Sequence, residues 1–389
     1  MRTGLDLLLT DLKALVAGKA VGLVVNQTAV DANLVHAIDR FLADPDLNPV
    51  RLFGPEHGVR GDAQDMITVE DQRDARSGLP VVSLYGQEEG SLRPTPASLQ
   101  DLQVLVFDIQ DIGSRYYTFI YTMAYCMEAA GQAGIPIVVC DRPNPITGTP
   151  REGNVLDMAF RSFVGRYPLP IRHGMTAGEL ALFFREHCGV LCDLKVVPME
   201  GWSRDQWFDQ TGLPWVQPSP NMPTVDTALV YPGMCLIEGT NVSEGRGTTR
   251  PFHLIGAPWI DGHALADALN TLALPGVRWR PTAFTPMFQK FQRQQCGGVE
   301  LHVIDRNHFK PVLSGVALLQ ALHRLYPDDF RWRTERYEYV SDTLAIDLLG
   351  GGQVLRQQVE AQVPLAVIEA FWESELRGFR HLSDHCLLY

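Results

Sequence analysis

The stretch VRLFGPEHGVRGD, residues 50–62, joins a short apolar run to an irregular polar loop. Residues 50–53 predict a β-strand, and the glycines and the proline that follow exclude a regular element. The loop carries two carboxylates, an imidazole and a guanidinium. Because loops on a rigid scaffold often carry chemistry, we take Glu56 as the leading candidate for proton transfer, with a polar surface turn as the simpler alternative.

The segments around this stretch predict an α/β fold. Apolar runs of strand length alternate with segments of helical spacing, a pattern typical of a parallel sheet that is covered on both faces. The predicted strands are residues 20–25, 50–53, 80–85, 104–108, 136–140 and 194–198, and the predicted helices are residues 4–17, 33–42, 96–102, 119–131 and 176–187. We therefore expect a Rossmann-like parallel-sheet domain over residues 1–250.

A smaller α+β domain, which closes the cleft, is expected over residues 251–389. A chain of 389 residues is too long for one ordinary core, so two domains are the default. The predicted strands are residues 277–280 and 298–303, and the predicted helices are residues 261–272, 314–326 (with Ser314 as its cap) and 364–376.

Polar side chains stand where four of the predicted strands end. These residues are Asn26, Glu56, Asp108 and Asp141. The carboxyl ends of parallel strands lie on one edge of an open α/β sheet, where ligands bind, so the fold would bring the four residues to one rim. The alternative is that each of them is a helix cap or a turn former.

A second polar loop, residues 237–252, places two carboxylates, an amide and two guanidinium groups between glycines. Such a loop can present donors to an anionic or polyhydroxyl ligand. The alternative is a flexible connector between domains.

The overall composition excludes several classes of protein. The chain is 46% hydrophobic and 20% charged, which indicates a globular protein, and its net charge of −12 argues against nucleic-acid and anionic-membrane partners. Neither GxGxxG after the first strand nor GxxxxGK[ST] occurs, so no cofactor is expected. The seven cysteines lack zinc-ligand spacing, and we see no signal peptide, so we expect a cytoplasmic protein, with a trimmed exported one as the alternative.

The polar residues are compatible with two kinds of hydrolase. GxSxG and HExxH are absent, which argues against a serine elbow and a zincin. One hypothesis is a glycosidase in which a carboxylic acid protonates the leaving oxygen. The second is a metal-dependent hydrolase with ligands from Glu56, His57, Asp62, Asp108 and Asp141. A non-catalytic binder of wall fragments is a third hypothesis.

Four motifs resemble the exo-β-N-acetylmuramidase family, peptidoglycan-recycling glycosidases long catalogued as a domain of unknown function of the DUF1343 type. They are GPEHGVRG (54–61), FDIQDIGSRYYT (107–118), DRPNP (141–145) and EGTNVSEGRG (238–247). The resemblance implies a Rossmann-like domain, a C-terminal domain and a cleft between them. It implies release of N-acetylmuramic acid (MurNAc) from the non-reducing end of peptidoglycan fragments such as MurNAc-GlcNAc. It also implies that Glu56 is the general acid. Our hypothesis is that His57, Asp108 and Asp141 tune or position Glu56.

The expected ligand is therefore a muramic acid saccharide. We expect an arginine guanidinium to pair with its lactyl carboxylate. Arg60, Arg115 and Arg246 are the candidates. The full predicted binding set is Asn26, Arg60, Gln110, Arg115, Tyr116, Asn144, Asn221, Glu238, Asn241, Glu244 and Arg246. A homodimer is an open option. Well-known members of the family carry an export signal, which we do not see here.

Overall fold

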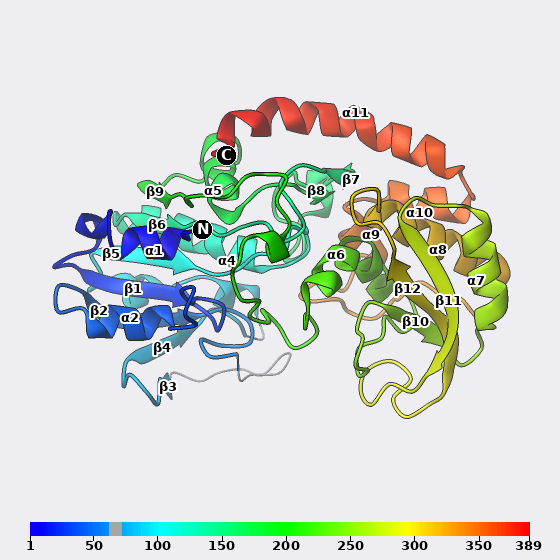
Figure 1. Cartoon of the computed structure of the whole chain (residues 1–389), viewed down its shortest axis with the longest axis horizontal. Helices are drawn as coiled ribbons and strands as arrows, with labels where there is room; N and C mark the ends of the chain where they lie inside the picture. Colours follow the sequence, from blue (N-terminus) through cyan, green and yellow to red (C-terminus); the bar gives the residue numbers. More distant parts are fainter. Residues whose placement is uncertain (62–71, 87) are drawn as a thin grey trace.

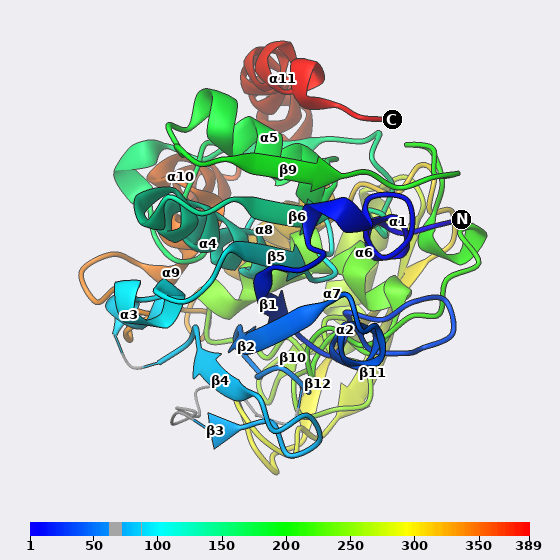
Figure 2. The ribbon, with the colours of Figure 1, turned by 90° about the vertical axis from the view of Figure 1, so that its left-hand side faces the viewer.

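The computed structural model describes residues 1–61, 72–86 and 88–389, so Asp62 lies outside the described residues. Within the described part, seven strands form the main sheet in the order β3-β4-β2-β1-β5-β6-β9. The six strands other than β3 run parallel, in the order of a Rossmann fold. Their bounds are β1 (Ala20–Val25), β2 (Asn48–Gly54), β4 (Pro80–Ser83), β5 (Val104–Asp108), β6 (Ile137–Cys140) and β9 (Leu194–Val197), and the antiparallel edge strand is β3 (Gln72–Arg73). Figure 2 shows these strands in that order, from β3 at the bottom to β9 at the top.

Alternate residues of the central strands pack into two separate cores, one on each face of the sheet. On β1, Leu23 and Val25 contact one core and Val24 the other. On β5, Val106 and Phe107 divide in the same way. One face is covered by α1 (Gly4–Leu8) and α2 (Ala37–Ala43), and the other by α3 (Pro96–Leu99), α4 (Phe119–Ala133) and α5 (Ala177–His187). The prediction of a parallel sheet covered on both faces is confirmed.

The C-terminal part contains a small antiparallel sheet with the order β10-β12-β11 and helices packed around it. Its elements are α6 (Val225–Met234), η5 (Cys235–Gly239), β10 (Leu254–Ala257), α7 (Gly262–Thr271), β11 (Val277–Phe284), β12 (Cys296–Val303), α8 (Pro311–Leu325), α9 (Ala345–Gly350) and α10 (Gln353–Glu360). A two-stranded sheet, β7 (Glu152–Val155) and β8 (Pro170–Arg172), belongs to the first part. Figure 1 shows the two parts side by side. The division at residue 250 stays a prediction, although α6 and η5, which precede it in the chain, pack against α8 and α9 of the C-terminal part.

A long helix, α11 (Leu365–Ser383), returns from the C-terminal part to the first one. It packs against α8, β7 and α5, and the short 3₁₀ segment η6 (Asp384–Cys386) follows it beside α5. Figure 1 shows α11 as the red helix across the top of both parts. After it, Leu388 N–H donates to Glu179 at 3.0 Å, and the Tyr389 hydroxyl donates to Asp141 at 2.8 Å.

Several predicted elements differ from the structure. The predicted helix 4–17 is wrong, because α1 ends at Leu8 and only a 3₁₀ turn, η1 (Lys13–Leu15), follows it. Ser314 is not a cap, because Pro311 begins α8 and Ser314 lies buried inside it. The sequence did not reveal α6, which is buried along most of its length and therefore lacks a polar face.

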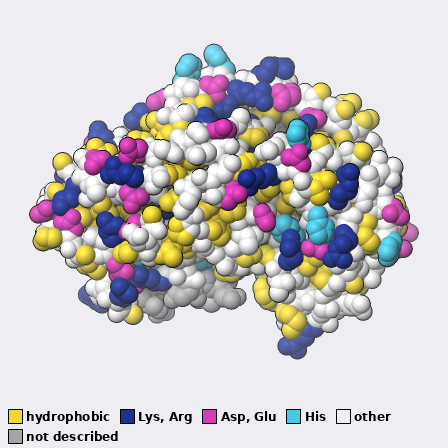
Figure 3. All heavy atoms as spheres, in the orientation of Figure 1, with side chains coloured by type: hydrophobic (Ala, Val, Ile, Leu, Met, Phe, Trp, Pro, Cys, Tyr) yellow, Lys and Arg dark blue, Asp and Glu magenta, His cyan; other side chains and the backbone are white. Residues whose placement is uncertain are grey.

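On the molecular face shown in Figure 3, positive and negative side chains are interspersed, and the outline is notched at its lower edge between the two parts. Among the described residues, no helix combines the length and apolar character that crossing a lipid bilayer requires.

Candidate active site

A hollow of about 550 Å³, open solvent included, is lined by residues from both parts of the chain. Loops after β2 and β5 form one side, and α6, η5 and a loop before α9 form the other. The lining residues are Glu56, His57, Tyr116, Tyr117, Thr118, Phe119, Val164, Ser219, Asn221, Tyr231, Glu238, Arg246, Tyr337 and Glu338. The hollow therefore exists only where distant segments of the chain meet.

Glu56 stands on a tight turn at the carboxyl end of β2. The turn is closed by a hydrogen bond from Gly58 N–H to the Pro55 carbonyl at 2.9 Å. His57 adopts a φ of 74° in this turn and is buried, whereas Glu56 is half-buried. The backbone thus fixes the direction of Glu56.

Three tyrosine hydroxyls lie close enough to Glu56 for its carboxylate, when ionised, to affect their pKa. Burial raises the pKa of Tyr85, Tyr117 and Tyr339, and the Glu56 carboxylate raises each of them further. The Tyr85 hydroxyl also lies 3.5 Å from Glu338. These hydroxyls stay protonated at neutral pH, so they are available as hydrogen-bond donors around the carboxylates.

The opposite side of the hollow carries a fixed charge pair. Arg246 donates to Glu238 at 2.6 Å, and the Tyr337 hydroxyl donates to the other Glu238 oxygen at 2.9 Å. Burial alone would raise the pKa of Glu238, but Arg246 and Tyr337 outweigh burial and lower it. Glu238 is therefore ionised at neutral pH, while Lys290 holds the neighbouring Glu244 at 3.0 Å.

Aromatic rings form the floor between these charges. Tyr117 packs edge-on against Phe119 at 5.1 Å and against Tyr231 at 5.7 Å, measured between ring centroids. Tyr231 in turn packs against Phe252 at 4.8 Å. Rigid rings beside polar groups provide apolar surface for a sugar together with hydroxyl donors.

Six of the predicted site residues line the hollow: Glu56, His57, Tyr116, Asn221, Glu238 and Arg246. The sequence reasoning did not single out Ser219, Tyr231, Tyr337 or Glu338. The last two belong to a segment without a helical or strand period, and Glu338 has a φ of 51°. The signal available for them was the concentration of aromatic and charged residues in WRTERYEYVSD, residues 332–342.

The two predicted aspartates lie outside the lining of the hollow. Asp108 is fully buried and accepts two hydrogen bonds from Arg142, at 2.5 and 2.7 Å. Asp141 accepts hydrogen bonds from Thr176 and Gly178, both at 2.7 Å, besides the one from Tyr389. Burial raises the pKa of Asp141 to about 7. These contacts hold the rim of the sheet together and give no support to a role in proton transfer.

The remaining predicted binding residues also have partners away from the hollow. Arg60 pairs with Asp74 at 2.9 and 3.0 Å. Arg115 is fully buried and donates to the carbonyls of Asn154, Leu169 and Leu349. Asn26 and Gln110 both bond to Thr28, Asn144 bonds to Met175, and Asn241 bonds to Asp329 and Arg331. Glu244 bonds to Lys290 and also pairs at 3.4 Å with Arg246, which lines the hollow. These residues fix the loops that carry the hollow.

The hollow lies where a Rossmann-like sheet domain meets a second domain, and it places carboxylates beside tyrosine rings. This arrangement suits a carbohydrate-active enzyme, and a glycosidase in particular. Comparison with known proteins gives the same class. Family models described as "Exo-beta-N-acetylmuramidase NamZ, N-terminal" and "C-terminal" match residues 21–226 and 229–389. The chain belongs to this exo-β-N-acetylmuramidase family.

Relatives match the chain along its whole length. A Bacillus subtilis (strain 168) protein named peptidoglycan beta-N-acetylmuramidase NamZ is 47% identical over 389 residues, which is 100% of this chain and 91% of that protein. Two DUF1343 family proteins from Bacteroides fragilis NCTC 9343 have similar structures, with TM-scores of 0.90 and 0.78. They are 37% and 29% identical, and each alignment covers 100% of this chain and 98% of the other.

Proposed function

We propose that this protein is an exo-acting glycoside hydrolase that releases N-acetylmuramic acid from the non-reducing end of peptidoglycan fragments such as MurNAc-GlcNAc. The observation that carries the proposal is the position of Glu56, which the backbone fixes at the wall of a hollow lined by further carboxylates and by tyrosines. Family membership and the name of the Bacillus relative support the same activity. In this proposal, the C-terminal domain closes the hollow over the sugar.

Glu56 acts as the general acid. Protonation of a leaving sugar oxygen at neutral pH needs a carboxylic acid that keeps its proton, and nearby negative charge favours the protonated form. Glu238 and Glu338 line the same hollow, and Arg246 keeps Glu238 ionised. The Glu238 carboxylate can therefore stabilise the positive charge that develops on the sugar ring during bond cleavage.

Arg246 binds the lactyl carboxylate of muramic acid. Of the three arginines predicted for this task, Arg246 lines the hollow, whereas Arg60 and Arg115 bond to Asp74 and to backbone carbonyls. The guanidinium of Arg246 already contacts Glu238 at 2.6 Å and Glu244 at 3.4 Å, so in this proposal the lactyl carboxylate shares the five guanidinium donors with both carboxylates.

Substitution Glu56→Gln tests the acid role. We expect hydrolysis of MurNAc-GlcNAc to fall by about 10²–10⁴-fold, the usual contribution of a general acid. An aryl glycoside with an acidic phenol as leaving group needs less proton donation and should lose much less activity. The exposed Glu335→Gln is the matched control and should behave as the wild type in both assays. Unchanged hydrolysis of the disaccharide by the Glu56→Gln protein, with an intact fold by circular dichroism, would exclude the role.

Substitution Arg246→Lys tests lactyl recognition. Lysine keeps the charge beside Glu238 but loses the planar pair of donors. We expect kcat/KM to fall about tenfold or more for a muramic acid glycoside and less for the N-acetylglucosamine glycoside, which has no lactyl group. Arg60→Lys, at a pair outside the hollow, should not change this ratio. An equal loss on both substrates in the Arg246→Lys protein would contradict the assignment.

A further inference from the structure

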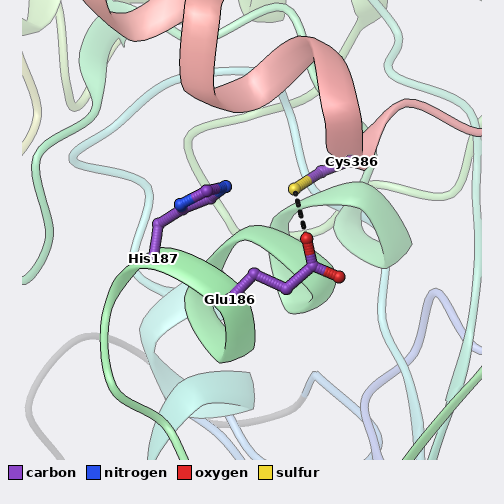
Figure 4. Close-up of side chains that lie close together, drawn as sticks. All are labelled: Glu186, His187 and Cys386. Atoms are coloured by element: carbon purple, nitrogen blue, oxygen red, sulfur yellow. Dashed lines mark hydrogen bonds between the residues drawn. The ribbon is translucent and has the colours of Figure 1, made fainter.

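Away from the hollow, three side chains of different chemistry meet where the end of the chain returns to the sheet domain. Glu186 and His187 are the last residues of α5, and Cys386 ends η6. One potential ligand atom of each lies within 4.8 Å of those of the other two. Figure 4 shows the two side chains of α5 and the thiol of Cys386 arranged around a common space. We propose that this trio is a binding site for a zinc-type divalent metal ion.

The donor set suits zinc. A thiolate, an imidazole nitrogen and a carboxylate oxygen are its three usual protein ligands, and water can complete a tetrahedron. A sulfur donor disfavours magnesium and calcium, which prefer oxygen ligands. Among the described residues, this is the one group of at least three histidine, cysteine, aspartate or glutamate side chains with such spacing, and it lies outside the lining of the hollow.

Neighbouring residues already orient the ligands. Arg185 donates to one oxygen of Glu186 at 3.1 Å, and the Cys386 thiol donates to the other oxygen at 3.7 Å. The ring of His187 packs at 5.2 Å from that of Phe183, measured between centroids. Partners that fix the ligands in this way are a regular part of metal sites. Glu186 and His187 are exposed, so an ion can enter from solvent, while Cys386 is buried.

Binding replaces a proton by the metal ion. The ion bonds to sulfur as the thiol releases H⁺ to solvent, without any change of oxidation state.

Such a site would fasten the returning segment to the sheet domain. Residues 384–389 follow α11, which comes from the C-terminal part, and Leu388 and Tyr389 bond to Glu179 and Asp141. A metal ion between η6 and α5 adds a cross-link at the start of this segment. Because the ion binds the folded arrangement only, it should raise the melting temperature of the full chain.

The test uses the full-length protein freed of metal by a chelator. Zn²⁺ alone is titrated in competition with a chromophoric chelator, and Co²⁺ alone serves as the optical probe, because a cobalt–thiolate bond gives a charge-transfer band in the near ultraviolet. We expect one ion per chain. Cys386→Ser should abolish the band, and His187→Gln and Glu186→Gln should each weaken Zn²⁺ binding by about tenfold or more.

Two matched controls keep the thiol and imidazole content comparable. Cys192→Ser removes a half-buried thiol outside the trio, and His381→Gln removes an exposed imidazole of α11. Both proteins should bind as the wild type does. The proposal fails if the wild type binds no stoichiometric Zn²⁺, or if Cys386→Ser keeps the cobalt band. Because His187 is exposed, the His187→Gln protein should fold even if Cys386→Ser does not, and unchanged Zn²⁺ affinity in that protein would also overturn the proposal.

Discussion

His57 takes a backbone conformation that glycine adopts more easily. Its φ of 74° lies in the left-handed region, and the same turn carries Glu56. We predict that His57→Ala is less stable than His57→Gly by about 1–2 kcal/mol, since alanine keeps the steric cost of this region while glycine relieves it. Urea unfolding of the two proteins measures the difference. Equal stabilities would show that the turn carries no strain.

The two substitutions His57→Ala and His57→Gly also distinguish the role of the His57 backbone conformation from that of its imidazole ring. Both proteins lack the ring, so they should lose activity together if the ring contacts substrate. Restored activity in the glycine protein alone would instead mean that His57 matters through the shape of the turn.

Some residues that line the hollow could be predicted one by one and others could not. Glu56, Glu238 and Arg246 were recognisable because charged side chains between glycines or prolines mark loops fixed for binding. That Asp108 would pair with Arg142 was not predictable, since the pair depends on the neighbouring positions of β5 and β6 in the sheet.

Helices α6 and α8 approach so closely that glycines occupy their contact. A Cβ atom at Gly233 would lie 1.8 Å from the Pro311 carbonyl oxygen, which is backbone and cannot turn away. We predict that Gly233→Ala destabilises the protein by about 3 kcal/mol or more and lowers activity, because α6 carries Tyr231 and leads into Glu238.

A glycine on α11 is the matched control for this substitution. Gly378 is exposed within that helix, and nothing lies within 4 Å of a Cβ added there. Gly378→Ala should therefore stabilise the protein by about 0.5–1 kcal/mol and leave activity unchanged. Thermal melting and the disaccharide assay measure both effects. A tolerated Gly233→Ala would show that α6 can shift freely.

Elements with a clear pattern were predicted well. β1 and β5 were predicted to the residue, because buried parallel strands are continuous apolar runs with sharp polar ends. By contrast, α6 has Pro232 inside it and is buried along most of its length, so neither its period nor its composition indicates a helix. Tertiary packing, which a local pattern does not contain, decides such an element.

The stability of the whole molecule should depend on pH through two carboxylic acids whose pKa is raised in the folded state. Burial raises the pKa of Asp141 and of Glu152 to about 7, from ordinary values of 3.8 and 4.5. At a pH between the ordinary and the raised pKa, each group keeps in the folded state a proton that it has released in the unfolded state. The contribution of Asp141 and Glu152 to the free energy of unfolding therefore falls as pH rises from about 4 to 7. His36 and His253, whose pKa burial lowers, act in the opposite direction.

Asp141→Asn isolates one of these contributions. An amide resembles the protonated acid, and the hydroxyls of Thr176 and Tyr389 can rotate to accept its protons. We predict that the stability of this protein relative to the wild type increases from pH 4.5 to pH 7.5. Melting temperatures across that range measure the trend, and a constant difference would contradict the raised pKa.

Residues of both parts of the chain line the hollow. The rate of catalysis should therefore depend on how the two parts pack against each other. One hydrophobic core contains residues of both parts, so in a gradual urea titration catalysis and far-ultraviolet ellipticity should be lost over the same range of denaturant. The rate of substrate cleavage would then report on the folding of the whole chain, because neither part carries the complete hollow.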